Sequence, residues 1–442
     1  MPFLMRAYIC PVFALIICLA LTACFSPVSL PPTVEPPLPT PTPQVEPVTL
    51  TWSFWGDPWE VEINERVIRV FERENPQIKI ETFHRPWNDY FIDLRAKFDQ
   101  GEPVPDVLFW AQAPIDISKG YFLNIAPLIE AENYDLEDFY PGLMVHFKTG
   151  ADTIYGFPRD SDTKVIFFNK RLFNRADVPL PQPGWTWADL RATALALKEA
   201  GVTDYSFAYE VNYWWMIYMW QNDIQVFDDK LFPTRTFLGE PEAAEAIQYF
   251  ADLTNVDQVT PPYETLRSSE EIARLFKEQK LAMAFGNHAL VPAFSQIDTF
   301  DWDVVGLPQG KRRGNLATGA GYVISARTEH PEEAWTFLKF LASPKGQAIF
   351  TESGLAVPAR RSVAESEIFM KPGARYKVKA FLDEVEIGEA NPAFPGANDI
   401  IDLMNNQVLP PVWRGEQDAA SAIQAALPQI EQILETNQPP ER

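Results

Sequence analysis

Three stretches decide the fold of this chain: "VTLTWSFW" (residues 48–55), "QIKIETF" (residues 77–83) and "PDVLFWA" (residues 105–111). Each is short and rich in β-branched and aromatic residues, which is typical of β-strands. Between them lie two segments, residues 60–76 and 87–101, in which apolar residues recur at helical spacing; one ends at a proline and the other at a glycine. The order strand, helix, strand, helix, strand predicts a parallel sheet with right-handed crossovers.

A second alternation of strand-like and helix-like segments begins after "IYGFPRDSDTKVIFFNK" (residues 154–170). It includes the helical pattern "WTWADLRATALALKEAG" (residues 185–201) and the amphipathic segment "PEEAWTFLKFLAS" (residues 331–343). A chain of 442 residues exceeds the size at which one core usually keeps growing. We therefore expect an α/β protein with two domains.

The ends of the first three strands are the first candidate site. In open sheets of this kind, ligands bind outside the carboxyl ends of the strands. Those ends carry aromatic, charged and amide side chains in three loops: Trp55-Gly56-Asp57, Arg85-Pro86-Trp87 and Trp110-Ala111-Gln112.

Charge and composition exclude several classes of protein. The formal net charge of -23 argues against a nucleic-acid partner, because such binding relies on clustered Lys and Arg. The four histidines are widely separated and the three cysteines lie within the first 24 residues, so neither type forms a zinc-ligand pattern. We expect no metal and no cofactor.

The N-terminus has the pattern of an export signal. An apolar run of about eighteen residues follows Arg6, which is typical of a secretory signal peptide. It ends in Leu21-Thr22-Ala23-Cys24, which resembles a bacterial lipobox, so we expect cleavage after residue 23 and lipidation of Cys24. The alternative is an uncleaved signal anchor. Either way, the folded part lies outside the cytoplasmic membrane.

Residues 24–47 predict a spacer. A proline occurs at every second or third position of "FSPVSLPPTVEPPLPTPTPQVEP" (residues 25–47), which favours extended polyproline II. At about 3.1 Å per residue such a segment reaches roughly 70 Å. We expect it to hold the folded domain near the membrane surface.

The order of motifs resembles the family 1 extracellular solute-binding proteins, the lipoprotein receptors of ABC-type sugar importers, over residues 48–434. The matching pieces, in chain order, are "PDVLFWA", "KGYFLNIAPLI", "YGFPRDSDTKVIFFNKRLF", "WTWADL", "LAMAFGN", "DWDVVGLPQG", "GAGYVISARTEHPEEAWTFLKFLASPKGQ" and "GLAVPARRSVAES".

The resemblance implies the type II periplasmic-binding-protein fold: two α/β lobes, each a mainly parallel sheet flanked by helices, joined by hinge crossings. It places the crossings within residues 155–169, near residues 318–325 and shortly after residues 358–361. The N-terminal lobe would then hold residues 48–158 and about 320–361. The C-terminal lobe would hold about 163–317 and 362–442.

The implied function is that of a receptor and not of an enzyme. A carbohydrate would bind in the cleft between the lobes, and hinge closure would deliver it to the permease subunits of an ABC importer. We expect a monomer tethered by its lipid anchor to the outer face of the cytoplasmic membrane. The alternatives are the same fold binding a polyamine or another non-sugar solute, a receptor that signals to a sensor, and a secreted glycoside hydrolase.

The predicted ligand-binding residues combine aromatic platforms with carboxylates and amides. Some come from the strand ends and neighbouring helix starts, and others from positions that match sugar-contacting positions of the maltose-binding branch. For each, packing in a core or a structural hydrogen bond is the alternative. The set is Trp55, Asp57, Trp87, Tyr90, Trp110, Gln112, Asp160, Asp162, Glu210, Tyr213, Trp214, Asn287 and His288.

Two departures from the maltose-binding branch put maltodextrin itself in doubt. His288 stands where the branch has a tryptophan after "FGN", and no aromatic residue stands near Ile401 and Asp402.

The run "YEVNYWWMIYMW" (residues 209–220) is either a core helix or a binding surface. Apolar residues surround the helix on all sides, which is typical of a buried helix. We expect its later residues in the core and its beginning at the ligand site, with the change between Trp214 and Tyr218.

Overall fold

The computed structural model describes residues 47–56, 58–111, 113–150, 153–212, 214–354 and 356–437. The predicted signal peptide (residues 1–23), Cys24 and all of the linker except Pro47 lie outside these ranges. A search of the described helices finds none with the length and apolar character that a membrane span requires.

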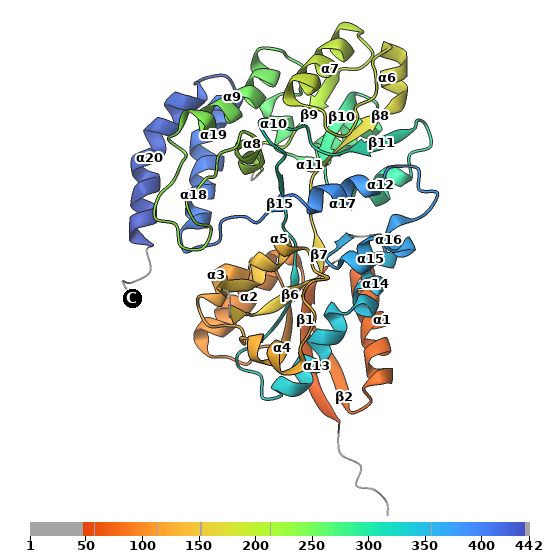
Figure 1. Cartoon of the computed structure of the whole chain (residues 1–442), viewed down its shortest axis with the longest axis vertical. Coiled ribbons are helices and arrows are strands. Elements are labelled where there is room, and N and C mark those ends of the chain that lie inside the picture. The colour runs from red at the N-terminus through yellow and green to blue at the C-terminus, as the bar shows by residue number, and fades with distance from the viewer. Residues whose placement is uncertain are drawn as a thin grey trace, which may run out of the picture. The chain divides into compact units, whose positions relative to one another are not determined.

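The first three predicted strands lie side by side in a five-stranded sheet in the order β2-β1-β3-β13-β6, with β2 at its edge (Figure 1). Strand β1 runs parallel to both β2 and β3, as the sequence predicts. Strand β13 runs antiparallel to its neighbours β3 and β6. The bounds are β1 Val48–Trp55, β2 Ile78–Arg85, β3 Val107–Trp110, β6 Gly156–Pro158 and β13 Gly321–Ile324.

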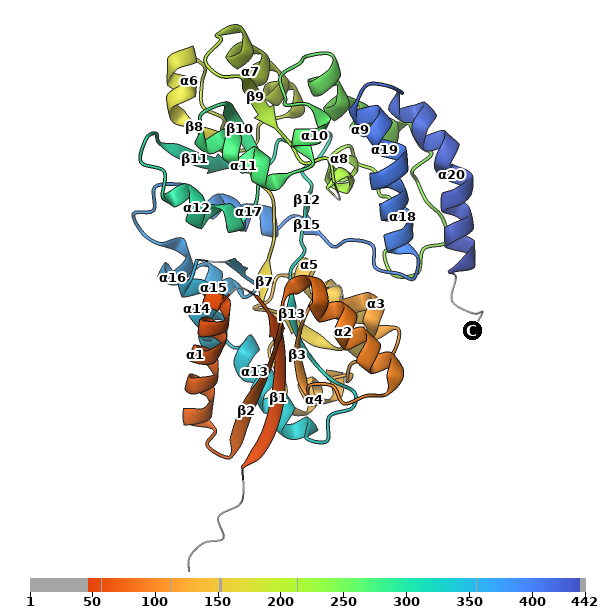
Figure 2. The ribbon, with the colours of Figure 1, turned by 180° about the vertical axis from the view of Figure 1, so that it is seen from behind.

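Helices cover both faces of this first sheet. Helix α2 (Trp87–Gln100) lies across the sheet from α1 (Pro58–Glu74), which packs with α13 (Pro331–Ala342) and α14 (Pro344–Glu352) (Figure 2). Because successive side chains of a strand point to opposite faces, Phe109 of β3 belongs to one core and Trp110 to the other. We call the sheet and its helices the N-lobe.

Short elements lie beside the N-lobe sheet and its helices. They are α3 Ala113–Ile117, α4 Ala126–Glu132, α5 Pro141–Met144, the 3-10 turn η1 Val145–Phe147, β4 Lys148–Gly150, β5 Thr153–Ile154, α15 Arg361–Ala364 and α16 Glu367–Met370.

The second sheet has the order β11-β8-β10-β9, and we call it and its helices the C-lobe (Figure 1). Strand β8 runs antiparallel to both β10 and β11, and only β9 and β10 are parallel. The bounds are β8 Val165–Asn169, β9 Tyr205–Ala208, β10 Leu281–Gly286 and β11 Trp302–Val305.

The helices of the C-lobe lie on and beside this sheet. Several begin at a side-chain cap or a proline; α7, for example, starts with a capping box between Thr186 and Asp189. Their bounds are α6 Lys170–Ala176, α7 Trp187–Glu199, α8 Trp215–Gln221, α9 Pro241–Asn255, α10 Tyr263–Leu266, α11 Ser269–Lys277, η2 His288–Leu290, α12 Val291–Ser295, α17 Lys379–Val385, α18 Ala397–Leu403, the π-helical turn η3 Met404–Val408, α19 Leu409–Trp413 and α20 Ala419–Thr436.

Two small strand pairs accompany the passages between the sheets. Strand β7 (Asp160–Ser161) pairs antiparallel with β14 (Val357–Pro358), and β12 (Asn315–Leu316) pairs in parallel with β15 (Gly388–Glu389). The chain leaves the first sheet after residue 158, enters the second at residue 165, and returns between residues 305 and 321.

The expected α/β fold with two lobes is confirmed, but the strand directions differ from a mainly parallel arrangement. Strand β13 returns from the other lobe, so it enters the first sheet from the edge at which β3 ends and runs against it. Local periodicity indicates a strand, but it does not predict the direction in which a strand from a distant part of the sequence joins the sheet. The lobe limits in residue numbers remain a prediction.

Candidate functional site

Several of the predicted residues lie at one end of the C-lobe sheet, where β8 begins and β9 and β10 end. Val165 at the start of β8 pairs with Gly286 at the end of β10, because these two strands are antiparallel. The end of β9 lies there too, because β9 and β10 are parallel. Residues just before β8 and just after β9 and β10 therefore meet there.

Asp162 and Asn287 meet at this end of the sheet. Asn287 Nδ2 donates a hydrogen bond to Asp162 Oδ1 over 2.5 Å. Both side chains are partly exposed, so the remaining carboxylate and amide atoms can reach a ligand. Asp162 precedes β8 and Asn287 follows β10, and both were predicted from the family positions.

Glu210 and Trp214 reach the same end of the sheet from the segment between β9 and α8. Glu210 is 7% exposed, and its Oε1 accepts a hydrogen bond from Ser269 Oγ over 3.0 Å. Trp214 is partly exposed and occupies the N-cap position of α8 without a side-chain cap hydrogen bond.

Lys164 joins these residues, and sequence reasoning missed it. Its ammonium lies 3.9 Å from the carboxylate of Glu210 and 3.7 Å from the centroid of the Trp214 ring. The ring of Phe285 in β10 is 5.8 Å away. Lys164 is only 2% exposed. The sequence signal was a lysine directly before the apolar run Val165 to Phe168, where a buried charge is rare.

We call Asp162, Lys164, Glu210, Trp214, Phe285 and Asn287 the C-lobe cluster. It offers two carboxylates, an amide, an ammonium and two aromatic rings.

A second aromatic group lies at the carboxyl ends of β1 and β2 in the N-lobe. Trp55 ends β1, and Trp87 begins α2 two residues after the end of β2. Their ring centroids are 5.0 Å apart at an interplanar angle of 78°. Trp55 also stacks on Phe109 at 4.1 Å, whereas Trp87 is 51% exposed. Trp87 therefore offers a free aromatic face, supported from behind by Trp55.

Trp110 and Tyr90, which were expected at the ligand site, lie in the N-lobe core with no exposed surface. The Trp110 indole N–H donates to Asp116 over 2.9 Å, and the Tyr90 hydroxyl donates to the Phe109 carbonyl over 2.8 Å. Burial raises the pKa of the Tyr90 hydroxyl, which stays a neutral donor. The physical reason is that helices cover both faces of β3, so alternate residues of this strand are all buried.

Asp160 and His288 also have structural partners. Asp160 binds the guanidinium of Arg159 over 2.6 Å and accepts a hydrogen bond from the backbone of Ala320, so it ties two passages between the lobes together. His288 is 4% exposed and packs against Phe381 and Phe369. Both differ from the expectation of ligand contact.

Asp57, Gln112 and Tyr213 lie outside the described residues, so their predicted ligand contacts remain predictions.

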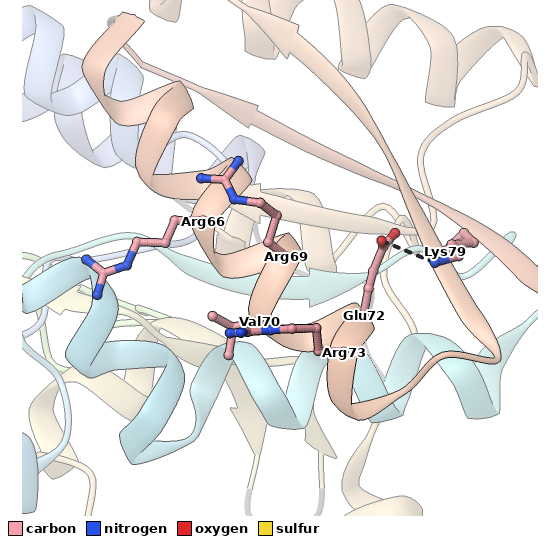
Figure 3. A pocket seen from close by; sticks show the side chains of 6 residues that line it. All are labelled: Arg66, Arg69, Val70, Glu72, Arg73 and Lys79. Carbon is pink, nitrogen blue, oxygen red and sulfur yellow. Dashed lines mark hydrogen bonds and ion pairs between the residues drawn. The ribbon is translucent and has the colours of Figure 1, made fainter. Parts of the chain in front are cut away.

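A surface pocket of about 590 Å³ lies elsewhere, over α1 and the start of β2 (Figure 3). Its lining holds four cations, but Lys79 is paired with Glu72 at 3.3 Å and Arg66 with Glu352 at 2.7 Å. None of the predicted ligand-binding residues lines it. We interpret it as a solvated helix face.

The pattern of two lobes, joined by short strand pairs and carrying polar and aromatic residues at the sheet ends, has known relatives. The sequence profile described as bacterial extracellular solute-binding protein matches residues 56–348. The chain belongs to this family.

Relatives and solved structures agree with the family. The galactooligosaccharide-binding protein of Bacillus subtilis is 23% identical over 381 residues, covering 84% of this chain and 86% of that protein. The sugar-binding protein MalE of Xanthomonas citri matches with a TM-score of 0.76 and 21% identity, covering 88% of this chain and 98% of that one. UgpB of Mycobacterium tuberculosis, solved with glycerophosphocholine, matches with a TM-score of 0.72 and 17% identity, covering 89% and 99%.

As a member of this family, the protein is a solute-binding receptor of the ABC-transporter type and works outside the cytoplasm.

Proposed function

We propose that this receptor binds a neutral carbohydrate between its lobes and delivers it to an ABC importer. The observation that carries the proposal is the C-lobe cluster. In it, Asn287 donates a hydrogen bond to Asp162, and Lys164 contacts both the Glu210 carboxylate and the Trp214 ring. A sugar hydroxyl both donates and accepts hydrogen bonds, so carboxylates and amides are suitable partners. Its apolar C–H faces suit aromatic rings.

The N-lobe contribution to the proposed site is Trp87. A half-exposed tryptophan at the carboxyl ends of parallel strands stands where ligands of open α/β sheets bind. In this proposal a sugar ring stacks on Trp87 while its hydroxyls bond to the C-lobe cluster, so the ligand favours the closed arrangement of the lobes.

The known relatives support a sugar without fixing which one. A galactooligosaccharide-binding protein and a protein named sugar-binding are among them, but the UgpB neighbour holds glycerophosphocholine. In the C-lobe cluster the one buried cation, Lys164, already lies beside Glu210. A phosphorylated ligand would need further cations there, so a neutral carbohydrate fits the cluster better.

The proposal includes the tether. Lipidation at Cys24 and the proline-rich segment would keep a monomeric receptor on the outer face of the cytoplasmic membrane, near its permease subunits.

A thermal-shift screen of the purified protein tests the proposal. The panel contains neutral mono- and oligosaccharides, sugar phosphates, glycerophosphodiesters and polyamines. A ligand that binds only the native state raises the melting temperature, so at least one neutral carbohydrate is expected to do so. Stabilisation by polyamines alone would reject the sugar assignment. Hydrolysis of any glycoside in the same samples would show an enzyme instead of a receptor.

A further inference from the structure

The C-lobe cluster contains the parts of a binding site for an organic ammonium ion. Such sites combine an aromatic face within about 6 Å with an anion and little water. Here the face is Trp214 at 3.7 Å, the anion is Glu210 at 3.9 Å, and a second ring, Phe285, lies at 5.8 Å. The side chains of Lys164 and Glu210 are only 3% and 9% exposed. The ammonium that fills the site belongs to the chain itself.

The side chain of Asn315 makes hydrogen bonds with both the N–H and the carbonyl of Lys164. The Lys164 N–H donates to Asn315 Oδ1 over 3.2 Å, and its carbonyl accepts from Asn315 Nδ2 over 2.7 Å. Asn315 is itself fully buried and donates to Glu384 over 2.6 Å. Because Asn315 lies in β12, on the return passage between the lobes, it ties the backbone of Lys164 to that passage.

We propose that Lys164 determines the specificity of the site by occupying its ammonium position, so that cationic solutes such as polyamines are excluded and neutral polyols are accepted. The carboxylates and aromatic rings alone would attract an organic cation. With Lys164 in place, a second cation would meet like charge at short range, in a site with little water to screen it. The exclusion of cations follows from the described contacts, whereas the acceptance of polyols rests on the proposed function.

The test replaces the lysine side chain by a free ion. Lys164→Ala removes the atoms beyond Cβ, which correspond to n-propylammonium. We expect this ion to raise the melting temperature of Lys164→Ala in a saturable manner and to leave that of the wild type unchanged. The neutral isostere n-propanol should bind at least about thirtyfold more weakly, because it lacks the attraction to the ring and the carboxylate.

A matched control is Lys339→Ala. Lys339 also lies over a tryptophan, Trp335 at 5.3 Å, and pairs with Glu132 at 2.6 Å, but its side chain is 25% exposed. Water screens this pair, so n-propylammonium should not stabilise the control. Equal stabilisation of Lys164→Ala by propanol and propylammonium would mean that the ligand only fills a cavity and that its charge contributes nothing. This result would overturn the inference. No stabilisation by either compound would overturn it too.

A second variant covers the case in which Lys164→Ala does not fold. Lys164→Met keeps most of the volume and removes the charge, and we expect it to bind putrescine at least tenfold more tightly than the wild type does, by calorimetry. An unchanged preference against putrescine in this variant would refute the role of Lys164. If n-propylammonium stabilises Lys164→Ala but no sugar binds the wild type, the proposed function is wrong and the inference about the cation site holds.

Discussion

Two tryptophans of the N-lobe show how far residue type alone predicts a role. Trp87 and Trp110 both stand near the carboxyl ends of strands, yet Trp87 is 51% exposed and Trp110 is fully buried. The difference comes from α2, which covers the face of β3 to which Trp110 points. Strand periodicity predicts that both faces are buried, but not which strand end stays open to a ligand.

The two tryptophans should respond differently to substitution. Trp110→Phe removes the hydrogen bond to the buried Asp116 carboxylate and should lower the free energy of unfolding by about 1–3 kcal/mol. Trp87→Phe should change it by less than about 1 kcal/mol, because the side chain is half exposed and the variant keeps an aromatic ring against Trp55. Chemical denaturation measures both values. Equal losses of stability in the two variants would contradict these environments.

Glu384 gives the protein a titration near neutral pH. Burial raises the pKa of this carboxyl from 4.5 to about 7, although Asn315 and Arg313 donate hydrogen bonds to it. Folding therefore favours the protonated form. The stability from this group is complete below pH 4.5 and is lost as the pH rises through about 7.

Glu384→Gln isolates this effect. The free energy of unfolding of the wild type, measured relative to the variant, should fall by about 3 kcal/mol between pH 4.5 and pH 8. Urea denaturation at a series of pH values measures the difference. A difference that stays constant over this range, or that rises with pH, would contradict the raised pKa.

At the scale of elements, the run of residues 209–220 was largely predictable. Helix α8 starts at Trp215, all seven of its residues are buried, and Trp214 before it is partly exposed. The expected burial of the later residues is confirmed. Tyr209, Glu210 and Val211 at the start of the run are buried as well, so the change from ligand site to core between Trp214 and Tyr218 remains a prediction. The helix is apolar on all sides, so its burial follows from composition. The contact between Trp214 and Lys164 depends on how the second sheet is assembled, so the sequence of the run could not predict it.

The passages between the lobes depend on Asn315 and on close backbone approaches. A Cβ on Gly319 would lie 2.1 Å from the carbonyl oxygen of Asp160, so only glycine lets these two passages approach. The family resemblance places crossings within residues 155–169 and near residues 318–325, and the chain passes between the sheets at residues 158–165 and 305–321. The resemblance did not reveal that one buried amide joins these passages.

Asn315→Ala tests that role. The substitution leaves the Lys164 N–H and carbonyl, and one oxygen of Glu384, without their present partner in a fully buried place. Each such group costs about 1–3 kcal/mol, so the free energy of unfolding should fall by at least about 3 kcal/mol. Asn75→Ala is the control, because the Asn75 side chain donates one hydrogen bond, to the Phe71 carbonyl near the end of α1, and is partly exposed. Similar small losses in both variants would mean that Asn315 is not what joins the passages.

At the scale of the whole molecule, the two-lobed fold places one candidate aromatic platform on the N-lobe and one polar cluster on the C-lobe. Neither group alone encloses a solute. If both contact the same ligand, binding and lobe closure are linked, and a ligand at a hundred times its Kd should add about 2.7 kcal/mol to the free energy of unfolding.

The most direct measurement is isothermal titration calorimetry of the neutral carbohydrate that stabilises the wild type best, applied to the wild type, Trp87→Ala and Asp162→Asn. We predict saturable binding at one site per chain in the wild type and a loss of at least about tenfold in affinity in each variant, since one removes an aromatic platform and the other a charged acceptor. Binding that neither substitution weakens, or no binding of any neutral carbohydrate, would contradict a sugar held between these two groups.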